Sequence, residues 1–379
     1  MDWSTWRDEF PIFRSKIYLN TCSLGPLARR VREAQERFLD EWEAHGAAAW
    51  YDRWLDALDA LRGTFARVVG ARSEEVAIAP SVSVALSSIA SCLDYAARPK
   101  VVLSDLDFPT VAYQWAVKPG VEEVILPSVD RVSVAPEAYE DAIDERTAAV
   151  ATSHVFYMSG AIQDVARIAK AARAQGALSL VDAYHATGQV PTDVHALGVD
   201  VLVTGGLKWL LGGTGIALLY VRKDLVPSLR PTMTGWFGNA GQFEFDHRRF
   251  AFHDDARRFE LGTPALAAVY AAKAGLDLIL EIGVERLRTR QTELVDDLAD
   301  RAADAGFEIK TPADPERRAG IVMIRLENPA DAVGVLARRG IVVDHRHDRL
   351  RVSPFFYNTP DDHGRLIEAI RNRGRALRT

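Results

Sequence analysis

Two charged side chains stand at the ends of apolar segments. Lys208 follows the strand-like run in VLVTGGLKWLLGGTG. Burial between apolar stretches lowers the pKa of a lysine amine, which can then act as a nucleophile and form a Schiff base with a carbonyl. Asp182 ends the apolar run of SLVDAYHATGQVP, where an ionised carboxylate could keep a pyridine nitrogen protonated. Each residue alone also has a structural explanation, since a lysine can extend its amine to solvent and an aspartate can cap a helix.

Three further positions suggest groups that would bind a planar, anionic ligand. Ser81, Val82 and Ser83 join a predicted strand to a predicted helix, and hydroxyl and N–H groups at a helix N-terminus bind phosphate. Phe108 follows another strand and could stack on a flat cofactor or belong to the core. Arg351 has the guanidinium fork that suits a substrate carboxylate, although many arginines form surface ion pairs. Along the chain the order is phosphate site, aromatic residue, aspartate, lysine and arginine, and together these features describe a pyridoxal phosphate site.

The composition excludes several other classes of protein. The chain has 379 residues, is 48% hydrophobic and carries a net charge of −6, so it is globular and is not expected to bind nucleic acid. The longest apolar run, 216–221, is too short to span a membrane. Two cysteines, Cys22 and Cys92, together with an N-terminus that lacks an apolar leader, predict a reduced, cytoplasmic protein.

Nucleotide and metal motifs are absent from the sequence. No GxxxxGK[ST] occurs, and no GxGxxG follows a strand. His345 and His347 could form a metal pair, but a solvated loop is favoured and no metal is predicted. A nicotinamide-dependent dehydrogenase and a non-catalytic binding protein that kept the fold are the two rival interpretations.

The candidate residues need a sheet whose strand ends lie together. Apolar runs alternate with helical patterns, which is typical of βαβ units and a largely parallel sheet buried on both faces. A different region begins near residue 264, with one or two helices over 264–305 that break at Gly275 or Gly283 and a smaller set of strands and helices after them. The predicted strands of the first region cover 76–81, 100–105, 122–128, 148–155, 177–183, 200–206 and 217–223.

These features resemble the class V aminotransferase group of fold type I pyridoxal phosphate enzymes, which includes cysteine desulfurases, isopenicillin N epimerase and kynureninase. The resemblance runs from YLNTCSLGP to FFYNTPDD, and the kynureninase pattern is matched most fully, through FPT, SHVFYMSG, VDAYHATGQVP and GWFG. It implies an α/β fold whose large domain has a mainly parallel seven-stranded sheet flanked by helices, plus a smaller α+β C-terminal domain. The implied parts are an N-terminal segment that packs with the small domain (1–20), the cofactor domain (21–262) and the small domain (263–379).

The resemblance also implies roles for the residues around the cofactor ring. Lys208 would form the Schiff base with pyridoxal 5'-phosphate and later take the Cα proton of an L-amino acid substrate. Asp182 would pair with the pyridine nitrogen, and His185 would lie near the ring hydroxyl. Phe108 would stack on the ring, as a phenylalanine does in kynureninases.

Other matched positions concern the phosphate and the oligomer. Val82 and Ser83 would contact the phosphate through backbone and hydroxyl groups. Trp236 and Thr263 match positions that reach the phosphate from the partner subunit, which implies a homodimer with active sites at the interface. On the substrate side, the predicted residues are Arg351 for the α-carboxylate, Tyr157 and Asn358.

Departures from the known patterns bear on the reaction. Leu207 precedes the lysine where kynureninases have Tyr and desulfurases have His, and Val111 and Met158 replace an Asp and an Arg of the kynureninase pattern. The desulfurase loop cysteine is missing from VVDHRHDRLR, which disfavours that activity. The expected reaction is transamination or kynureninase-like cleavage of a Cβ–Cγ bond, with epimerisation or carbon–sulfur lysis as alternatives.

Overall fold

A seven-stranded sheet forms the centre of the larger part of the chain in this computed structural model, which describes residues 2–372. Only β8 runs antiparallel to its neighbours, β2 and β7, and all other pairs are parallel, so the predicted mainly parallel sheet is confirmed. Every strand coincides with a predicted apolar run. In spatial order they are β2 (Val76–Ala79), β8 (Ala217–Val221), β7 (Val201–Gly205), β6 (Leu178–Asp182), β5 (Thr147–Ser153), β3 (Lys100–Ser104) and β4 (Glu122–Leu126).

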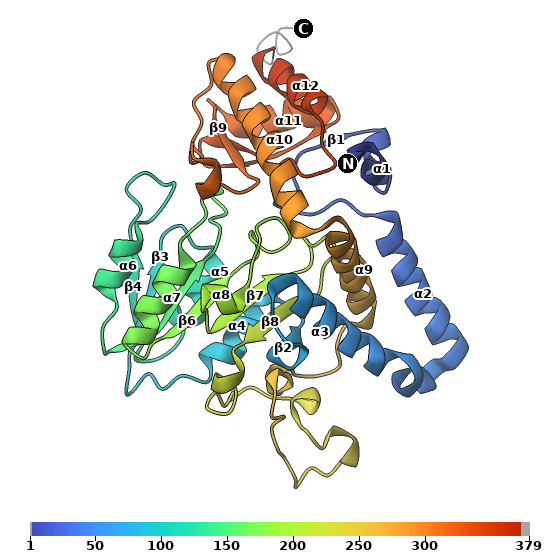
Figure 1. Cartoon of the computed structure of the whole chain (residues 1–379), viewed down its shortest axis with the longest axis vertical. Helices are drawn as coiled ribbons and strands as arrows, with labels where there is room; N and C mark the ends of the chain where they lie inside the picture. The colour runs from blue at the N-terminus through green and yellow to red at the C-terminus, as the bar shows by residue number, and fades with distance from the viewer. Residues whose placement is uncertain (1, 373–379) are drawn as a thin grey trace.

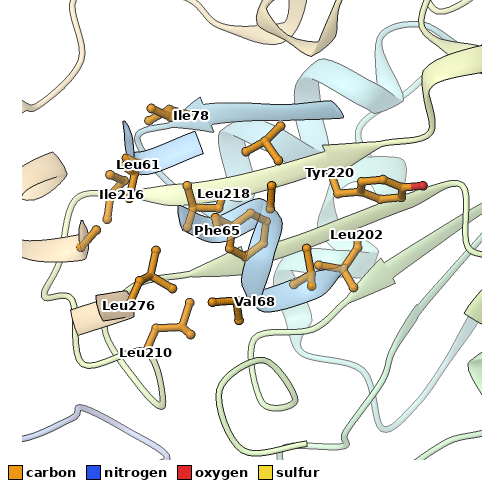
Figure 2. Close-up of a cluster of buried hydrophobic side chains, with 14 of the residues drawn as sticks. Leu61, Phe65, Val68, Ile78, Leu202, Leu210, Ile216, Leu218, Tyr220 and Leu276 are labelled. Atoms are coloured by element: carbon orange, nitrogen blue, oxygen red, sulfur yellow. The ribbon is translucent and has the colours of Figure 1, made fainter. Parts of the chain in front are cut away.

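The central strands are buried on both faces of the sheet. Alternate residues of each strand point to opposite sides, so one strand contributes to two apolar clusters. Leu218 and Tyr220 of β8 pack in a cluster with Phe65 (Figure 2), whereas Leu219 and Val221 belong to the cluster on the other face. Helices α3 (Leu55–Val69) and α7 (Val165–Ala174) contribute to the first cluster, and α4 (Val82–Ala90) and α5 (Pro109–Ala116) to the second. Two shorter helices, α6 (Pro136–Ala142) and α8 (Val194–Leu197), complete this part.

Two long helices connect the larger part to the C-terminal part. Helix α9 (Leu266–Ile282) ends at Gly283, whose φ of 90° is unfavourable for other residues, and α10 (Val284–Asp304) begins directly after it. Gly275 does not break the helix, because it lies inside α9, where a Cβ atom would come within 2.3 Å of the Leu210 carbonyl oxygen. The polar helix α2 (Arg29–His45) runs along α9 (Figure 1) and was not predicted from the sequence.

The C-terminal part contains an antiparallel sheet in the order β11 (Asp344–Arg346), β12 (Arg349–Val352) and β9 (Val322–Arg325). Helices α10, α11 (Pro329–Arg338) and α12 (Pro360–Arg371) lie around this sheet at the top of Figure 1.

The N-terminal segment also lies beside the C-terminal part. After α1 (Trp3–Arg7), the short strand β1 (Ile17–Tyr18) pairs in parallel with β10 (Ile341–Val342). The domain limits predicted from the sequence stay a prediction.

Within residues 2–372, no helix is both long enough and apolar enough to cross a bilayer. The cytoplasmic location stays a prediction.

Candidate active site

A cavity of about 350 Å³ opens where β3, β5, β6 and β7 end, which is where parallel α/β sheets bind ligands. Its wall also includes the first turn of α4. Eight residues predicted from the sequence line this cavity together. They are Ser81, Val82, Ser83, Phe108, Tyr157, Asp182, His185 and Lys208.

Lys208 lies in the turn after β7, and its amine points at an imidazole. Its Nζ atom is 2.7 Å from Nε2 of His185 and 4.2 Å from the centre of the Tyr184 ring. Burial lowers the pKa of Lys208 to about 8, although the negative charge of Asp182 opposes this shift. A substantial fraction of the amine is therefore neutral near pH 8 and can act as a nucleophile or a base.

A second contact of His185 shows which of its ring nitrogens carries the proton. The indole N–H of Trp209 donates to Nδ1 of His185 at 3.4 Å. Burial, together with the charges of Lys208 and two arginines, lowers the pKa of His185 well below its usual range, so the ring is neutral. Because Nδ1 accepts, the single ring proton is on Nε2 and faces the lysine amine. Sequence reasoning missed Trp209, whose only signal is an indole donor directly after the lysine.

Asp182 is the last residue of β6, and its carboxylate lies on the cavity wall. Among the described residues, its side chain has one hydrogen bond, in which Oδ1 accepts the Tyr184 N–H at 2.8 Å. Burial raises the pKa of Asp182 to about 6, and the Tyr184 N–H and the charge of Lys208 limit that rise. The group is ionised at neutral pH and has accepting capacity left for a ligand.

The first turn of α4 forms another wall of the cavity. Ser81 caps this helix, because its hydroxyl accepts the Val84 N–H at 3.2 Å. The hydroxyls of Ser83 and Thr110 lie 2.6 Å apart on the same wall. A helix N-terminus that carries hydroxyl groups is a suitable site for a phosphate.

Phe108, between β3 and α5, is exposed on the cavity wall. The residue is 45% exposed, and its ring meets that of Tyr157 edge to face at a centroid distance of 5.2 Å. A ring that lies open on a cavity wall can stack on a planar ligand.

The donor set of this cavity fits pyridoxal phosphate. Lys208 supplies an amine for the aldehyde, and Asp182 supplies a carboxylate for the pyridine nitrogen. The first turn of α4 supplies N–H and hydroxyl groups for the phosphate, and Phe108 supplies an aromatic face. These residues, with His185, would hold the cofactor.

Two predicted substrate residues do not line the cavity. Arg351 is only 2% exposed and lies behind the wall, where its Nη2 donates to Ser23 Oγ at 2.7 Å and to Asp344 Oδ2 at 2.8 Å. Asn358 is buried, and its Nδ2 donates to the Tyr18 carbonyl oxygen at 3.0 Å. These contacts connect Asn358 to β1, and its role in substrate binding stays a prediction.

The two residues predicted to reach a partner subunit also lie outside the main cavity. Trp236 is partly exposed among Phe237, Phe243 and Phe245, and its indole N–H donates to the Gln242 carbonyl oxygen. Thr263 lines a smaller cavity of about 190 Å³. That cavity shares Pro80, Gly215 and Ile216 with the main one. Contacts across an interface by Trp236 and Thr263 stay a prediction.

Comparisons with known proteins show the family of the chain. The sequence profile of the family described as aminotransferase class-V matches residues 17–359. A Bacillus subtilis protein described as an uncharacterized aminotransferase is 36% identical over 96% of this chain and 96% of its own length. Isopenicillin N epimerase from Streptomyces clavuligerus is 30% identical over 97% of this chain and 98% of its own. Kynureninase from Geobacillus thermodenitrificans is 28% identical over 92% and 86%, respectively.

The fold is shared with solved structures at lower identity. The apo structure of a cysteine desulfurase from Thermococcus onnurineus NA1 has a TM-score of 0.88 at 22% identity and covers 98% of this chain and 97% of that one. The family profile extends over most of the chain, and the chain has the fold of fold type I enzymes. The chain therefore belongs to the class V aminotransferase family of pyridoxal-phosphate-dependent enzymes.

Proposed function

We propose that this enzyme is a transaminase that acts on L-amino acids and moves the Cα proton with Lys208. The observation that carries the proposal is the contact between the Lys208 amine and the Nε2–H of His185, beside the carboxylate of Asp182. This arrangement provides a neutral base, a hydrogen-bond donor and an anion within one cavity.

Each residue would have a separate task in the reaction. Bound pyridoxal phosphate supplies an electron sink for the negative charge that develops at the substrate Cα. Asp182 would hold a proton on the pyridine nitrogen, and Lys208, when neutral, would take the Cα proton and return it to another carbon. His185 would donate its Nε2–H first to Lys208 and then to an oxygen on the ligand. Transamination differs from the alternative reactions in where Lys208 returns the proton.

A kynureninase-like cleavage of the Cβ–Cγ bond is the second candidate, supported by the positions of Phe108 and His185 on the cavity wall. Two departures from the kynureninase pattern count against it. Val111 is 1% exposed and Met158 is 6% exposed, each inside an apolar cluster. No polar side chain at these positions is present to serve the substrate, which favours transamination.

Cysteine desulfuration and epimerisation rank lower. The hairpin from Asp344 to Val352 contains no cysteine. Cys22 is buried, and burial raises the pKa of Cys92 to about 12, so Cys92 stays a thiol at neutral pH. Epimerisation needs a second proton donor on the opposite face of the substrate, and no residue has been assigned to that role.

The test is a single turnover of cofactor-loaded enzyme with a panel of L-amino acids and no 2-oxo acid acceptor. Transamination predicts one equivalent of the 2-oxo acid by mass spectrometry and a matching change in cofactor absorbance. Alanine and anthranilate from L-kynurenine would instead establish the second candidate. A Lys208→Ala variant is the control, and if it turned over as fast as the wild type, the proposal would be wrong.

A further inference from the structure

One oxygen of Asp344 accepts hydrogen bonds from Ser23 and from Arg351, the arginine predicted to bind the substrate carboxylate, and forms an ion pair with Arg346. Oδ2 of Asp344 lies 2.8 Å from Arg351 Nη2, 2.8 Å from Arg346 Nη1 and 3.0 Å from Ser23 Oγ. Asp344 and Arg351 are directly opposite each other in the antiparallel pair of β11 and β12. Arg346 is two residues after Asp344, so both side chains emerge on the same face of β11. Arg351 is therefore already paired with a carboxylate of the chain itself, that of Asp344.

This cluster lies directly behind the cavity wall. Ser23 and Tyr157 line the cavity, and Arg351 contacts both, through Ser23 Oγ at 2.7 Å and the Tyr157 carbonyl oxygen at 3.3 Å. The buried Nε–H of Arg351 has no acceptor among residues 2–372, so the guanidinium keeps a donor for a further oxygen. The charges of Arg351 and Arg346 both contribute to lowering the pKa of Lys208, which places the cluster within electrostatic range of the reacting amine.

The cluster of Asp344, Arg346 and Arg351 has a net positive charge that one more anion would neutralise. Arg346 and Arg351 carry two positive charges, and Asp344 carries one negative charge. Burial favours a raised pKa for Asp344, but the His345 N–H and the two arginines hold it below its usual value, so the group is ionised. A single substrate carboxylate makes the cluster neutral, whereas a second one would face no unpaired cation within it. Arg349, on the same hairpin, is held by the Arg131 carbonyl oxygen at 3.2 Å and does not add to the cluster.

We propose that Asp344 is a specificity-determining residue that restricts the enzyme to amino acids with a single carboxylate. Asp344 holds Arg351 before the substrate arrives and stays with Arg346 when the α-carboxylate takes Arg351. Its negative charge then repels a carboxylate on the substrate side chain. The inference rests on the proposed function, because it takes the ligand to be an amino acid.

The test compares isosteric ligands with an isosteric variant. Dissociation constants of L-glutamine and L-glutamate are measured from the absorbance of the cofactor in wild-type holoenzyme and in Asp344→Asn. The wild type should bind glutamine more tightly, and Asp344→Asn should raise the affinity for glutamate relative to glutamine by about tenfold or more. Asp348→Asn is the matched control, because Asp348 lies in the same hairpin, is half exposed and pairs with Arg325 outside the cluster. It should leave the ratio unchanged.

A second variant tests the role of Arg346 separately from that of Arg351. Arg346→Gln removes the alternative partner of Asp344, so both L-glutamine and L-glutamate should bind more weakly. The affinity for glutamate relative to glutamine should not rise. An unchanged ratio in Asp344→Asn would overturn the role of Asp344 while leaving the proposed function in place. Tighter binding of glutamate than of glutamine by the wild type would also overturn it, whether or not the variants fold. If no amino acid in the panel changed the cofactor spectrum of the wild type, both proposals would fail.

Discussion

Lys208 Nζ lies 2.7 Å from His185 Nε2, and the imidazole is held from its other side by the indole of Trp209. The base and its donor are thus in contact within the chain itself. The neutral imidazole donates and the neutral amine accepts, so the pair needs no charge on either member. This preorganisation leads to predictions that can be checked on the apoprotein.

The first prediction concerns the proton on His185. Above the pKa of Lys208 of about 8, where the amine is neutral and accepts, long-range ¹H–¹⁵N spectra of apoprotein labelled at histidine should show His185 as the Nε2–H tautomer. Trp209→Phe removes the donor to Nδ1 and should release the ring to a mixture of tautomers. Trp115→Phe is a matched control, since Trp115 is a buried tryptophan whose indole nitrogen has no partner among the described residues. An Nδ1–H tautomer in the wild type would contradict the assignment.

The second prediction concerns the Lys208 amine. Only the neutral amine reacts in reductive methylation, so labelling of Lys208 in apoprotein should rise with pH and reach half its limit near pH 8, in line with a pKa of about 8. Peptide mass spectrometry measures the extent, and the exposed Lys16 provides the reference within the same sample. Labelling of both lysines with the same pH dependence would show that burial does not shift Lys208.

The third prediction separates stability from activity at Asp182. Its pKa is 3.8 in the reference state and about 6 when folded, so ionisation lowers the free energy of unfolding as pH rises through that window. Asp182→Asn should therefore stabilise the apoprotein at pH 7 by up to about 3 kcal/mol, with little difference near pH 4. The same variant should lose at least about a hundredfold in kcat/KM, because an amide cannot balance a protonated pyridine. Urea unfolding at the two pH values and turnover of the holoenzyme check both parts.

The fourth prediction concerns Arg351. Arg351→Ala should raise KM for an amino acid substrate by an amount equivalent to about 2–5 kcal/mol. Asp344 would keep its contact with Arg346, so the variant is not left with an unpaired buried carboxylate. Arg325→Ala, on neighbouring β9 and more than half exposed, should leave KM unchanged. An unaltered KM in Arg351→Ala would exclude this residue as the carboxylate partner.

The fifth prediction concerns the homodimer. Sedimentation equilibrium should give twice the chain mass of 41.8 kDa. If Thr263 acts across the interface, inactive Lys208→Ala and impaired Thr263→Ala chains should recover activity when mixed and refolded together. One site of each mixed dimer then combines an intact Lys208 with an intact Thr263 from the other chain. No recovery in a confirmed mixed dimer would place Thr263 in its own chain's site.

The strands could be predicted because a strand buried on both faces needs apolar residues at nearly every position, and Gly and Pro bound such runs. The same reasoning placed Asp182 and Lys208 at strand ends, and both line the cavity. Helix α2 was missed because it is highly charged, with only Val31, Ala34 and Phe38 buried, and its packing on α9 is a tertiary contact.

Contacts between distant segments could not be predicted from the sequence. Ser23 and Asp344 are 321 residues apart, and only the folded chain brings them together behind the cavity. Trp209 directly follows Lys208, yet its contact with His185 depends on the path of the turn after β6. Sequence patterns show which residues can do chemistry, whereas the contacts that orient them arise from tertiary packing, both between the loops of the central sheet and against the C-terminal part.

The pairing of β1 with β10 has a consequence for synthesis of the enzyme. Ile17 and Tyr18 leave the ribosome more than three hundred residues before their partners Ile341 and Val342. The strand that carries Arg351, β12, follows those partners after the short strand β11. Because contacts at such separation form late, the nascent chain can build the cofactor-binding sheet well before it can hold a substrate carboxylate. Synthesis therefore completes all seven strands of the central sheet before the strand that carries Arg351 is made.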